Sequence, residues 1–276
     1  MLDPSVMYLF AKADAKTRQL EESMVRDLER MTALPGLKDF RDSHALPRAF
    51  FRAYISILRE VDEYNAEVRS QSTHVPSCVR GCTACCHMAP GDVGAAEYIG
   101  LYDRFTRSPQ KQMMLVQHQA NAFHFLRMWK EDVLFSLKLA SGISAQSAII
   151  SQIESTEDPV ELERLLRESE RGYSSTQESY FRRNVFPCGF LQEQECAAYG
   201  KRPLACRGHT SDAFLLLCEP DRYSIRGKAM VALPKEVLAA IYRVDSILGL
   251  NLSPTLPIGF MQLYDLMKGQ PIRRTQ

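Results

Sequence analysis

The chain has 276 residues, and 45% of them are hydrophobic, which is enough to build a buried core without cross-links. Its 34 basic and 33 acidic residues leave a net charge of +1, so neither nucleic acid nor an anionic membrane is expected as a partner. No apolar run approaches the ~20 residues of a membrane span, and no secretory signal is recognised at the N-terminus. We therefore expect a cytoplasmic protein, and a protein partner of unknown kind stays open.

Helical signals dominate the chain from one end to the other. Leu20, Met24 and Leu28 recur at the spacing of one helix face. Asp92 suits an N-cap, and Asp158-Pro159 is typical of a helix start. The predicted helices cover residues 4–32, 47–69, 92–105, 109–141, 144–155, 158–172, 235–248 and 259–267. Strand signals are weak and indicate at most a short pair around residues 223–231.

These elements predict a mainly α fold, in which a single helical domain is organised around a cysteine-bound metal site with at most a short β element. Residues 1–70 would form the N-terminal helices, and residues 231–276 the C-terminal helices. Residues 71–230 would form the cysteine-cluster region, with a helical insert at about 105–180. A metal in that region would join distant parts of the domain.

The eight cysteines fall into two groups, and their spacing is the strongest chemical signal in the sequence. The first group is Cys78, Cys82, Cys85 and Cys86, and the second is Cys188, Cys196, Cys206 and Cys218. Four thiolates complete one zinc site or hold one iron–sulfur cluster, so eight could serve one centre or two. Such soft ligands exclude magnesium and calcium as natural occupants. Burial as ordinary apolar cysteines does not account for four in nine residues, and a reducing compartment disfavours disulfides.

Residues beside the cysteines suggest how such a site would be supported. Basic side chains could offset the negative charge of a metal–thiolate site, and glycines would allow tight turns next to the ligands. The basic residues are Arg80, Lys201, Arg202 and Arg207, and the glycines are Gly189, Gly200 and Gly208. His87 and His209 lie near the cysteines, where a histidine could be an extra ligand or a proton carrier, but we expect a surface or packing role for both. His118 and His124 lie on the long helix without a partner motif.

The segments CVRGCTACC and FPCGFLQEQECAAYGKRPLACRGH resemble the YkgJ-type cysteine-cluster family of zinc- or iron-chelating proteins. The family pattern joins C-x-x-x-C-x-x-C-C to Pro-Cys-x-Phe-Leu and to Cys-x-x-Tyr-x-x-Arg-Pro-x-x-Cys-Arg. Its other positions here are Pro187, Phe190, Leu191, Tyr199, Arg202, Pro203 and Arg207. The resemblance covers about residues 78–218 with a long insert. It implies metal binding but no single agreed reaction. We expect Phe190, Leu191 and Tyr199 to pack so that the site stays dry.

We therefore expect a protein that holds a [4Fe–4S] cluster or zinc through its two cysteine groups, in a structural or electron-transfer role. Paired Cys-x-x-Cys knuckles typical of closed zinc sites are missing, which favours the cluster slightly. The alternatives are a protein-modifying enzyme, such as a lysine N-methylase that uses S-adenosylmethionine, or metal storage or delivery. Cys78, Cys82 and Cys85 also have the radical S-adenosylmethionine spacing, but no alternating strands for the required barrel follow.

Overall fold

The computed structural model describes residues 7–12, 14–72, 86, 91–140, 146–169, 171–173, 175–176, 179, 187–193, 195–211 and 228–276. Over these residues the fold is mainly helical, as the sequence predicts. The helices are α1 (Ala15–Thr32), α2 (Phe40–Ser43), α3 (Arg48–Ser70), α4 (Ala95–Thr106), α5 (Lys111–Ala140), α6 (Gln146–Ser155), α7 (Pro159–Glu168), α9 (Leu204–Gly208), α10 (Lys235–Leu248) and α11 (Leu256–Met267), with a 3₁₀ turn, η2, at Tyr199–Lys201.

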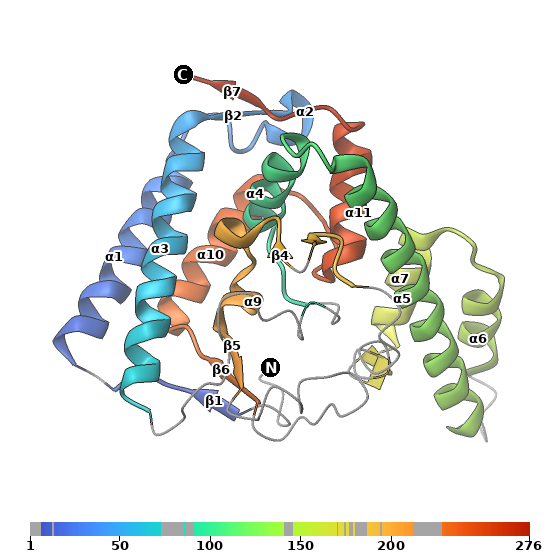
Figure 1. Cartoon of the computed structure of the whole chain (residues 1–276). Helices are drawn as coiled ribbons and strands as arrows, with labels where there is room; N and C mark the ends of the chain where they lie inside the picture. The colour runs from blue at the N-terminus through green and yellow to red at the C-terminus, as the bar shows by residue number, and fades with distance from the viewer. Residues whose placement is uncertain are drawn as a thin grey trace.

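Short strands are more numerous than the single pair that the sequence predicts. They are β1 (Met7–Leu9), β2 (Ala45–Pro47), β3 (Leu191–Gln192), β4 (Glu195–Cys196), β5 (His209–Ser211), β6 (Lys228–Val231) and β7 (Arg273–Thr275). They form a three-stranded sheet in the order β1-β6-β5 and the two-stranded pairs β2-β7 and β3-β4. In Figure 1 the three-stranded sheet and the β2-β7 pair lie at opposite ends of α3.

Two predicted helix starts are wrong, and local capping explains both. The first helix begins at Ala15 rather than near residue 4, because the Asp14 carboxylate accepts the Thr17 N–H at 2.8 Å and caps it there. The chain before it forms β1, which pairs in parallel with β6. α4 is capped at Gly94 rather than at Asp92, whose φ of 57° is incompatible with that role.

The helices enclose one large core. Figure 1 shows α1 and α3 side by side on the left and α5 and α11 on the right, with α4 and α10 between them. α1 packs on α3 and α10, while α11 packs on α4 and α5. Fully buried side chains of this core include Met24, Phe50, Tyr98, Val244 and Phe260. On α1 the buried residues Met24, Leu28 and Met31 are spaced four and three apart, so they share one face, as the periodicity predicts.

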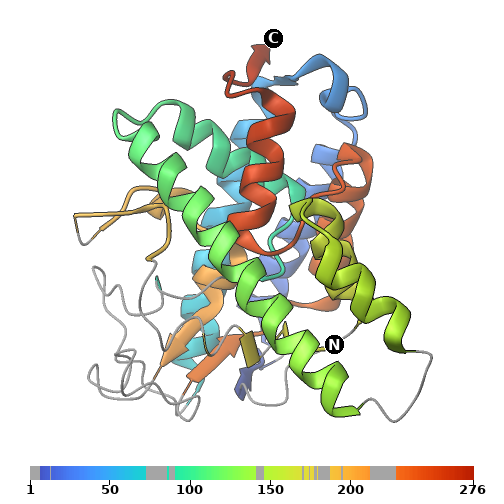
Figure 2. The same ribbon diagram turned by 90° about the vertical axis from the view of Figure 1, so that its right-hand side faces the viewer.

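A second, smaller core lies where the C-terminal half of α5 meets α6 and α7. Its buried side chains include Phe125, Trp129, Ile153 and Leu166. Figure 2 shows α5 running obliquely across the front of the molecule, with α6 and α7 on one side of its far half. α5 therefore belongs to both cores, because its first half packs against α11 near the segment that holds Cys188.

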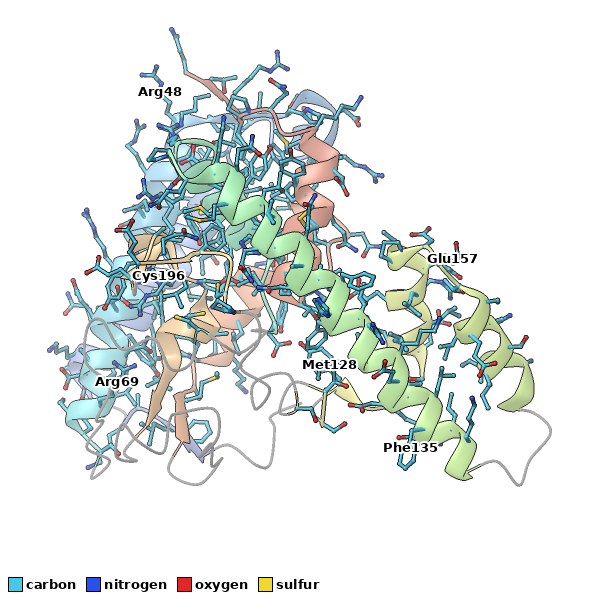
Figure 3. The ribbon with its side chains drawn as sticks, turned by 45° about the vertical axis from the view of Figure 1, so that its right-hand side comes forward. Arg48, Arg69, Met128, Phe135, Glu157 and Cys196 are labelled. Carbon is cyan, nitrogen blue, oxygen red and sulfur yellow. The ribbon has the colours of Figure 1, made fainter. Side chains whose placement is uncertain are left out.

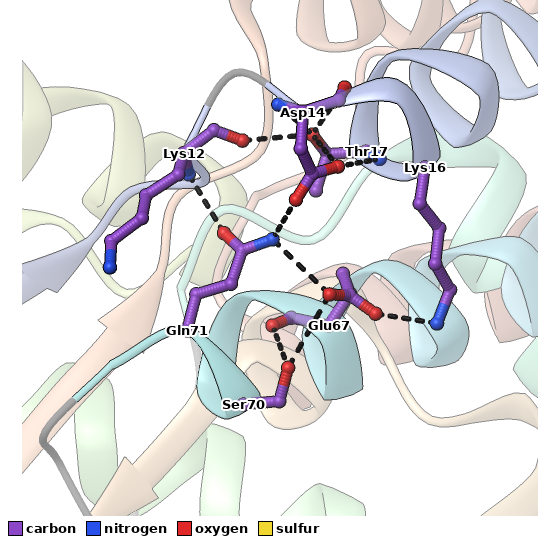
Figure 4. Close-up of polar contacts among 7 residues, drawn as sticks. All are labelled: Lys12, Asp14, Lys16, Thr17, Glu67, Ser70 and Gln71. Carbon is purple, nitrogen blue, oxygen red and sulfur yellow. Dashed lines mark hydrogen bonds and ion pairs between the residues drawn. The ribbon is translucent and has the colours of Figure 1, made fainter.

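The end of α3 is fixed just before the first cysteine group begins in the sequence. Gln71 accepts the Lys12 N–H at 2.8 Å through its side-chain oxygen, and its amide nitrogen donates to the Asp14 and Glu67 carboxylates (Figure 4). Lys16 pairs with Glu67 at 2.5 Å. This network ties the start of α1 to the last turn of α3.

Candidate metal centre

A backbone hydrogen bond joins the last residue of the first cysteine group to the first residue of the second. The Cys188 N–H donates to the Cys86 carbonyl oxygen at 2.6 Å, although residues 87–187 separate the two. Both side chains are half-buried. Cys78, Cys82, Cys85 and Cys218 lie outside the described residues. The fold thus brings the backbone of Cys86, from the first group, next to that of Cys188, from the second.

A tight hairpin links Cys188 to Cys196. After Cys188 the chain turns, with the Leu191 N–H donating to the Cys188 carbonyl at 2.8 Å, and β3 and β4 then pair Leu191 with Cys196. The Ala197 N–H closes the hairpin on the Phe190 carbonyl at 2.8 Å. Figure 3 labels Cys196 on this hairpin. Cys188 and Cys196 both pack against the large core, which fixes the position of each residue.

The short helix α9 carries Cys206, and a buried carboxylate fixes its start. Glu97 accepts the Leu204 N–H at 2.6 Å and the Gly94 N–H at 2.8 Å, so it caps α9 and α4 together. Burial raises the pKa of Glu97 to about 7, against the two backbone donors, which lower it. The Glu97 side chain therefore links the start of α4 to the start of α9, the helix that carries Cys206.

Arg207, next to Cys206, is almost wholly buried, and its guanidinium binds oxygen atoms. It donates to the Arg202 carbonyl at 2.8 Å, to the Gly200 carbonyl at 2.7 Å, to the Leu58 carbonyl at 3.4 Å and to the Asp62 carboxylate. Through these bonds Arg207 braces the loop that precedes Cys206 against α3.

Lys201 and Arg202 also have partners other than a thiolate. Lys201 pairs with Asp103 at 2.6 Å, and Arg202 donates to the Tyr199 carbonyl and stacks on the Tyr199 ring at 3.8 Å. Burial alone would raise the pKa of Asp103, but Lys201 and Arg274 hold it below its usual value. Arg80 lies outside the described residues. Lys201 is thus paired with a buried carboxylate, and Arg202 with a carbonyl and an aromatic ring.

Two side chains of the long helix α5, Asn121 and His118, contact the Pro187–Phe190 segment. The Asn121 amide donates to the Pro187 carbonyl at 2.8 Å. One turn earlier, the His118 ring is 1% exposed, stacks on Phe260 at 4.2 Å and meets Phe190 edge-on at 4.7 Å. Burial lowers the pKa of His118 to about 3, so its imidazole is neutral at neutral pH.

Gly189 lies in the turn that follows Cys188, and it also allows a close approach to α5. Its φ is not in the left-handed region, but a Cβ there would stand 2.4 Å from Cδ2 and 2.6 Å from Nε2 of His118. Gly208 approaches the Val231 carbonyl of β6, whereas a Cβ on Gly200 would meet nothing within 4 Å. Gly189 lies in the turn after Cys188 and Gly200 in the 3₁₀ turn η2, as predicted, whereas Gly208 ends α9. None of the three has a positive φ.

The sequence missed the role of His118 and misjudged Tyr199. Phe190 is buried as predicted and Leu191 is half-buried, but Tyr199 is 40% exposed and covers Arg202 instead of sealing the site. The glycine inside the Pro-Cys-Gly-Phe element was the one sequence signal that could have pointed to a close neighbour. Nothing in the sequence identified that neighbour as His118.

A groove of about 1000 Å³ opens beside Cys196. α3 contributes Arg59 and Asp62 to it, and α4 contributes Arg104. Residues 192–193 and 195–201 form another wall. The Arg104 Nε donates to the Ala197 carbonyl at 2.8 Å and so holds the wall that carries Cys196. The groove is large enough for a cofactor-sized ligand.

The side chains that the structure describes do not include three metal-ligating residues gathered at one point. In that same part of the chain, no helix has the length and hydropathy to cross a membrane. Comparison of the chain with protein-family models, with curated proteins and with solved structures gave no match. The predicted division into 1–70, 71–230 and 231–276 stays a prediction.

Proposed function

We propose that this protein binds a metal, as a [4Fe–4S] cluster or as zinc, through its two cysteine groups, as the resemblance to the YkgJ-type family implies. The observation that carries the proposal is the backbone hydrogen bond between Cys86 and Cys188, which brings two cysteines from distant parts of the chain to one junction. The donor set fits the metals, because four thiolates are the usual ligands of both centres.

The role that best accords with the surroundings is a structural or electron-transfer one. Cys188, Cys196 and Cys206 are each held by a separate element, namely the turn before β3, the strand β4 and the helix α9. A metal bound to such residues would join α3, α4 and α5 through the segments that pack on them. Cys78, Cys82, Cys85 and Cys218 complete the proposed ligand set.

Anaerobic purification followed by metal and acid-labile sulfide analysis tests this proposal. Iron and sulfide in similar amounts support a cluster, and stoichiometric zinc without sulfide supports a structural zinc site. The matched pair Cys206→Ser and Ala205→Ser adds a hydroxyl at neighbouring positions of α9, and only the first removes a thiol. We expect metal loss in Cys206→Ser alone. A wild-type protein without iron or zinc overturns the proposal.

The groove beside Cys196 favours a second function, a reaction on a bound ligand. Among such reactions, the sequence suggests lysine N-methylation with S-adenosylmethionine as the methyl donor. Calorimetric titration of the metal-loaded protein with S-adenosylmethionine tests it, with Arg104→Gln as the groove variant. Binding to the wild type that is weakened in the variant supports the second function, and no heat of binding to the wild type counts against it.

A further inference from the structure

One face of α3 carries three arginines beside the groove. Arg48, Arg52 and Arg59 are spaced four and seven residues apart, so they share one face of the helix. All three are exposed, and no described residue forms an ion pair or a side-chain hydrogen bond with them. Arg59 lines the groove together with Ile55, so this face of α3 is turned toward the groove.

The α4 side of the groove carries a second set of cations. Arg104 and Lys201 line it. The Asp103 carboxylate pairs with Lys201 at 2.6 Å, with Arg107 at 3.0 Å and with Arg274 at 2.9 Å. The Asp103 side chain is 3% exposed, whereas that of Arg107 is 54% exposed. One buried negative charge thus serves three cations, and the surface above it keeps an excess of positive charge.

Arg274 connects the two sides, because its guanidinium also lies 4.5 Å from the centre of the Phe51 ring on α3. In Figure 1, α3 begins beside the β2-β7 pair and passes β4 further along its length. The cations therefore form one surface, the basic strip, which runs from β7 to the groove. Its members come from α3, α4, η2 and β7, so the net charge of +1 does not reveal it. The basic strip consists of Arg48, Arg52, Arg59, Arg104, Arg107, Lys201 and Arg274.

The hairpin side of the groove has the opposite charge. Glu193 and Glu195 line it, and both are exposed. These carboxylates would repel a chain of phosphates that continued from the basic strip into the groove. A peptide avoids this conflict, because its side chains differ along its length. Ile55 and Leu58 add an apolar part to the lining, which suits an apolar side chain of a peptide.

We propose that the basic strip and the groove bind an acidic peptide segment of a partner protein. Carboxylates of the peptide would pair with the arginines of the strip, whose planar guanidinium groups bind carboxylates through two parallel hydrogen bonds. An apolar side chain of the peptide would lie against Ile55 in the groove. This inference goes beyond the proposed metal binding and does not rest on it.

Fluorescence anisotropy of the purified wild-type chain tests the proposal with a short labelled peptide of alternating glutamate and leucine. We expect binding at low salt that weakens as the salt concentration rises. A matched peptide of alternating lysine and leucine should not bind. Absence of binding by the glutamate peptide at low salt overturns the proposal. Tighter binding of labelled oligothymidylate than of the glutamate peptide also overturns it, since the partner would then be a nucleic acid.

The variants Arg59→Gln and Arg26→Gln show where the peptide binds. Arg59→Gln should weaken binding about fivefold, and the double variant Arg52→Gln, Arg59→Gln about tenfold or more. Arg26 is an exposed arginine of α1 outside the groove lining, so Arg26→Gln should keep the wild-type affinity. Because no described residue pairs with Arg59, its substitution should leave Tm unchanged, which thermal unfolding checks. Equal affinities of the double variant and Arg26→Gln overturn the proposal. Metal content is measured separately on the same samples, so failure of one proposal is distinguishable from failure of the other.

Discussion

At the scale of single residues, the side chains around the cysteines act mainly on the backbone that carries them. Arg207 binds three carbonyl oxygens and the Asp62 carboxylate, and Glu97 accepts two N–H groups at helix starts. Both are buried, so water cannot replace their partners. Substitution of Arg207 or Glu97 should therefore lower the free energy of unfolding before it changes any chemistry at the thiols.

Replacement of Arg207 by methionine should lower the free energy of unfolding by about 3 kcal/mol, because buried carbonyl acceptors lose their donor. The matched change Arg202→Met should cost less than about 1 kcal/mol, since Arg202 makes one backbone bond and a stacking contact near the surface. Urea unfolding of both variants measures the difference. Equal losses would show that the buried network is not what Arg207 contributes.

Glu97 should make stability depend on pH. Its pKa is about 7 in the folded chain against 4.5 for an unperturbed glutamate, so folding takes up a proton between these values. The stabilisation from this group is complete below about pH 4.5 and is lost as the pH rises through about 7. We expect the free energy of unfolding to fall more steeply from about pH 5 to about pH 8 in the wild type than in Glu97→Gln. Parallel urea-derived profiles would contradict this assignment.

At the scale of elements, α5 packs closely against the hairpin because residue 189 is a glycine and has no side chain. The His118 ring fills the place of a Cβ on Gly189, and the Asn121 amide fixes the carbonyl of Pro187. The hairpin that carries Cys188 and Cys196 is therefore positioned by α5 on one side and by the large core on the other.

Gly189→Ala should destabilise the protein by about 1–3 kcal/mol, because the added methyl must push back a buried ring or the backbone. Gly200→Ala is the control from the same motif. Its Cβ would meet nothing within 4 Å and its φ is not positive, so we expect a change within about 1 kcal/mol of zero. Thermal and urea unfolding check both values. A neutral Gly189→Ala would mean that the His118 contact is not tight.

Capping of α1 offers a second prediction at this scale. Asp14→Ala removes the cap on Thr17 and the acceptor for Gln71, so it should cost about 1–2 kcal/mol. Asp27→Ala, on the same helix, removes only a pair with the exposed Arg30 and should cost less than about 0.5 kcal/mol. Urea unfolding of the two variants compares them. Similar losses would show that the network in Figure 4 adds nothing to the ordinary surface contacts.

At the scale of the whole molecule, the chain leaves Cys86, forms α4 to α7, and returns to Cys188. The large core and the smaller core of α5, α6 and α7 are joined along α5. A metal at the cysteine junction would close a loop of 101 residues, 87–187. Stability and metal content should therefore be linked.

Removal of the proposed metal by an anaerobic chelator should lower Tm, because a ligand present at about 100 times its Kd stabilises the folded state by about 2.7 kcal/mol. Hydrogen exchange should accelerate around 187–196 and 204–208, whereas the cores of α1 and α10 should keep their protection. The chelator should not change Tm in Cys206→Ser. A chelator effect of equal size in that variant would show that the metal is bound elsewhere.

The sequence by itself determined the long helices, because apolar spacing of three and four residues is a local property that the large core preserves. It did not predict the short helices α2 and α9. It also singled out the cysteines as one chemical set. It placed the first helix start too early, because the capping contacts of Asp14 and the pairing of β1 with β6 do not show in periodicity.

Only the tertiary structure decided what surrounds the cysteines. Arg207 meets Asp62, Lys201 meets Asp103, and His118 meets Gly189. In each pair the two residues lie far apart in the sequence, so no spacing rule connects them. Their meeting depends on how α3, α4 and α5 pack, and that packing is set by the buried faces of all the helices together.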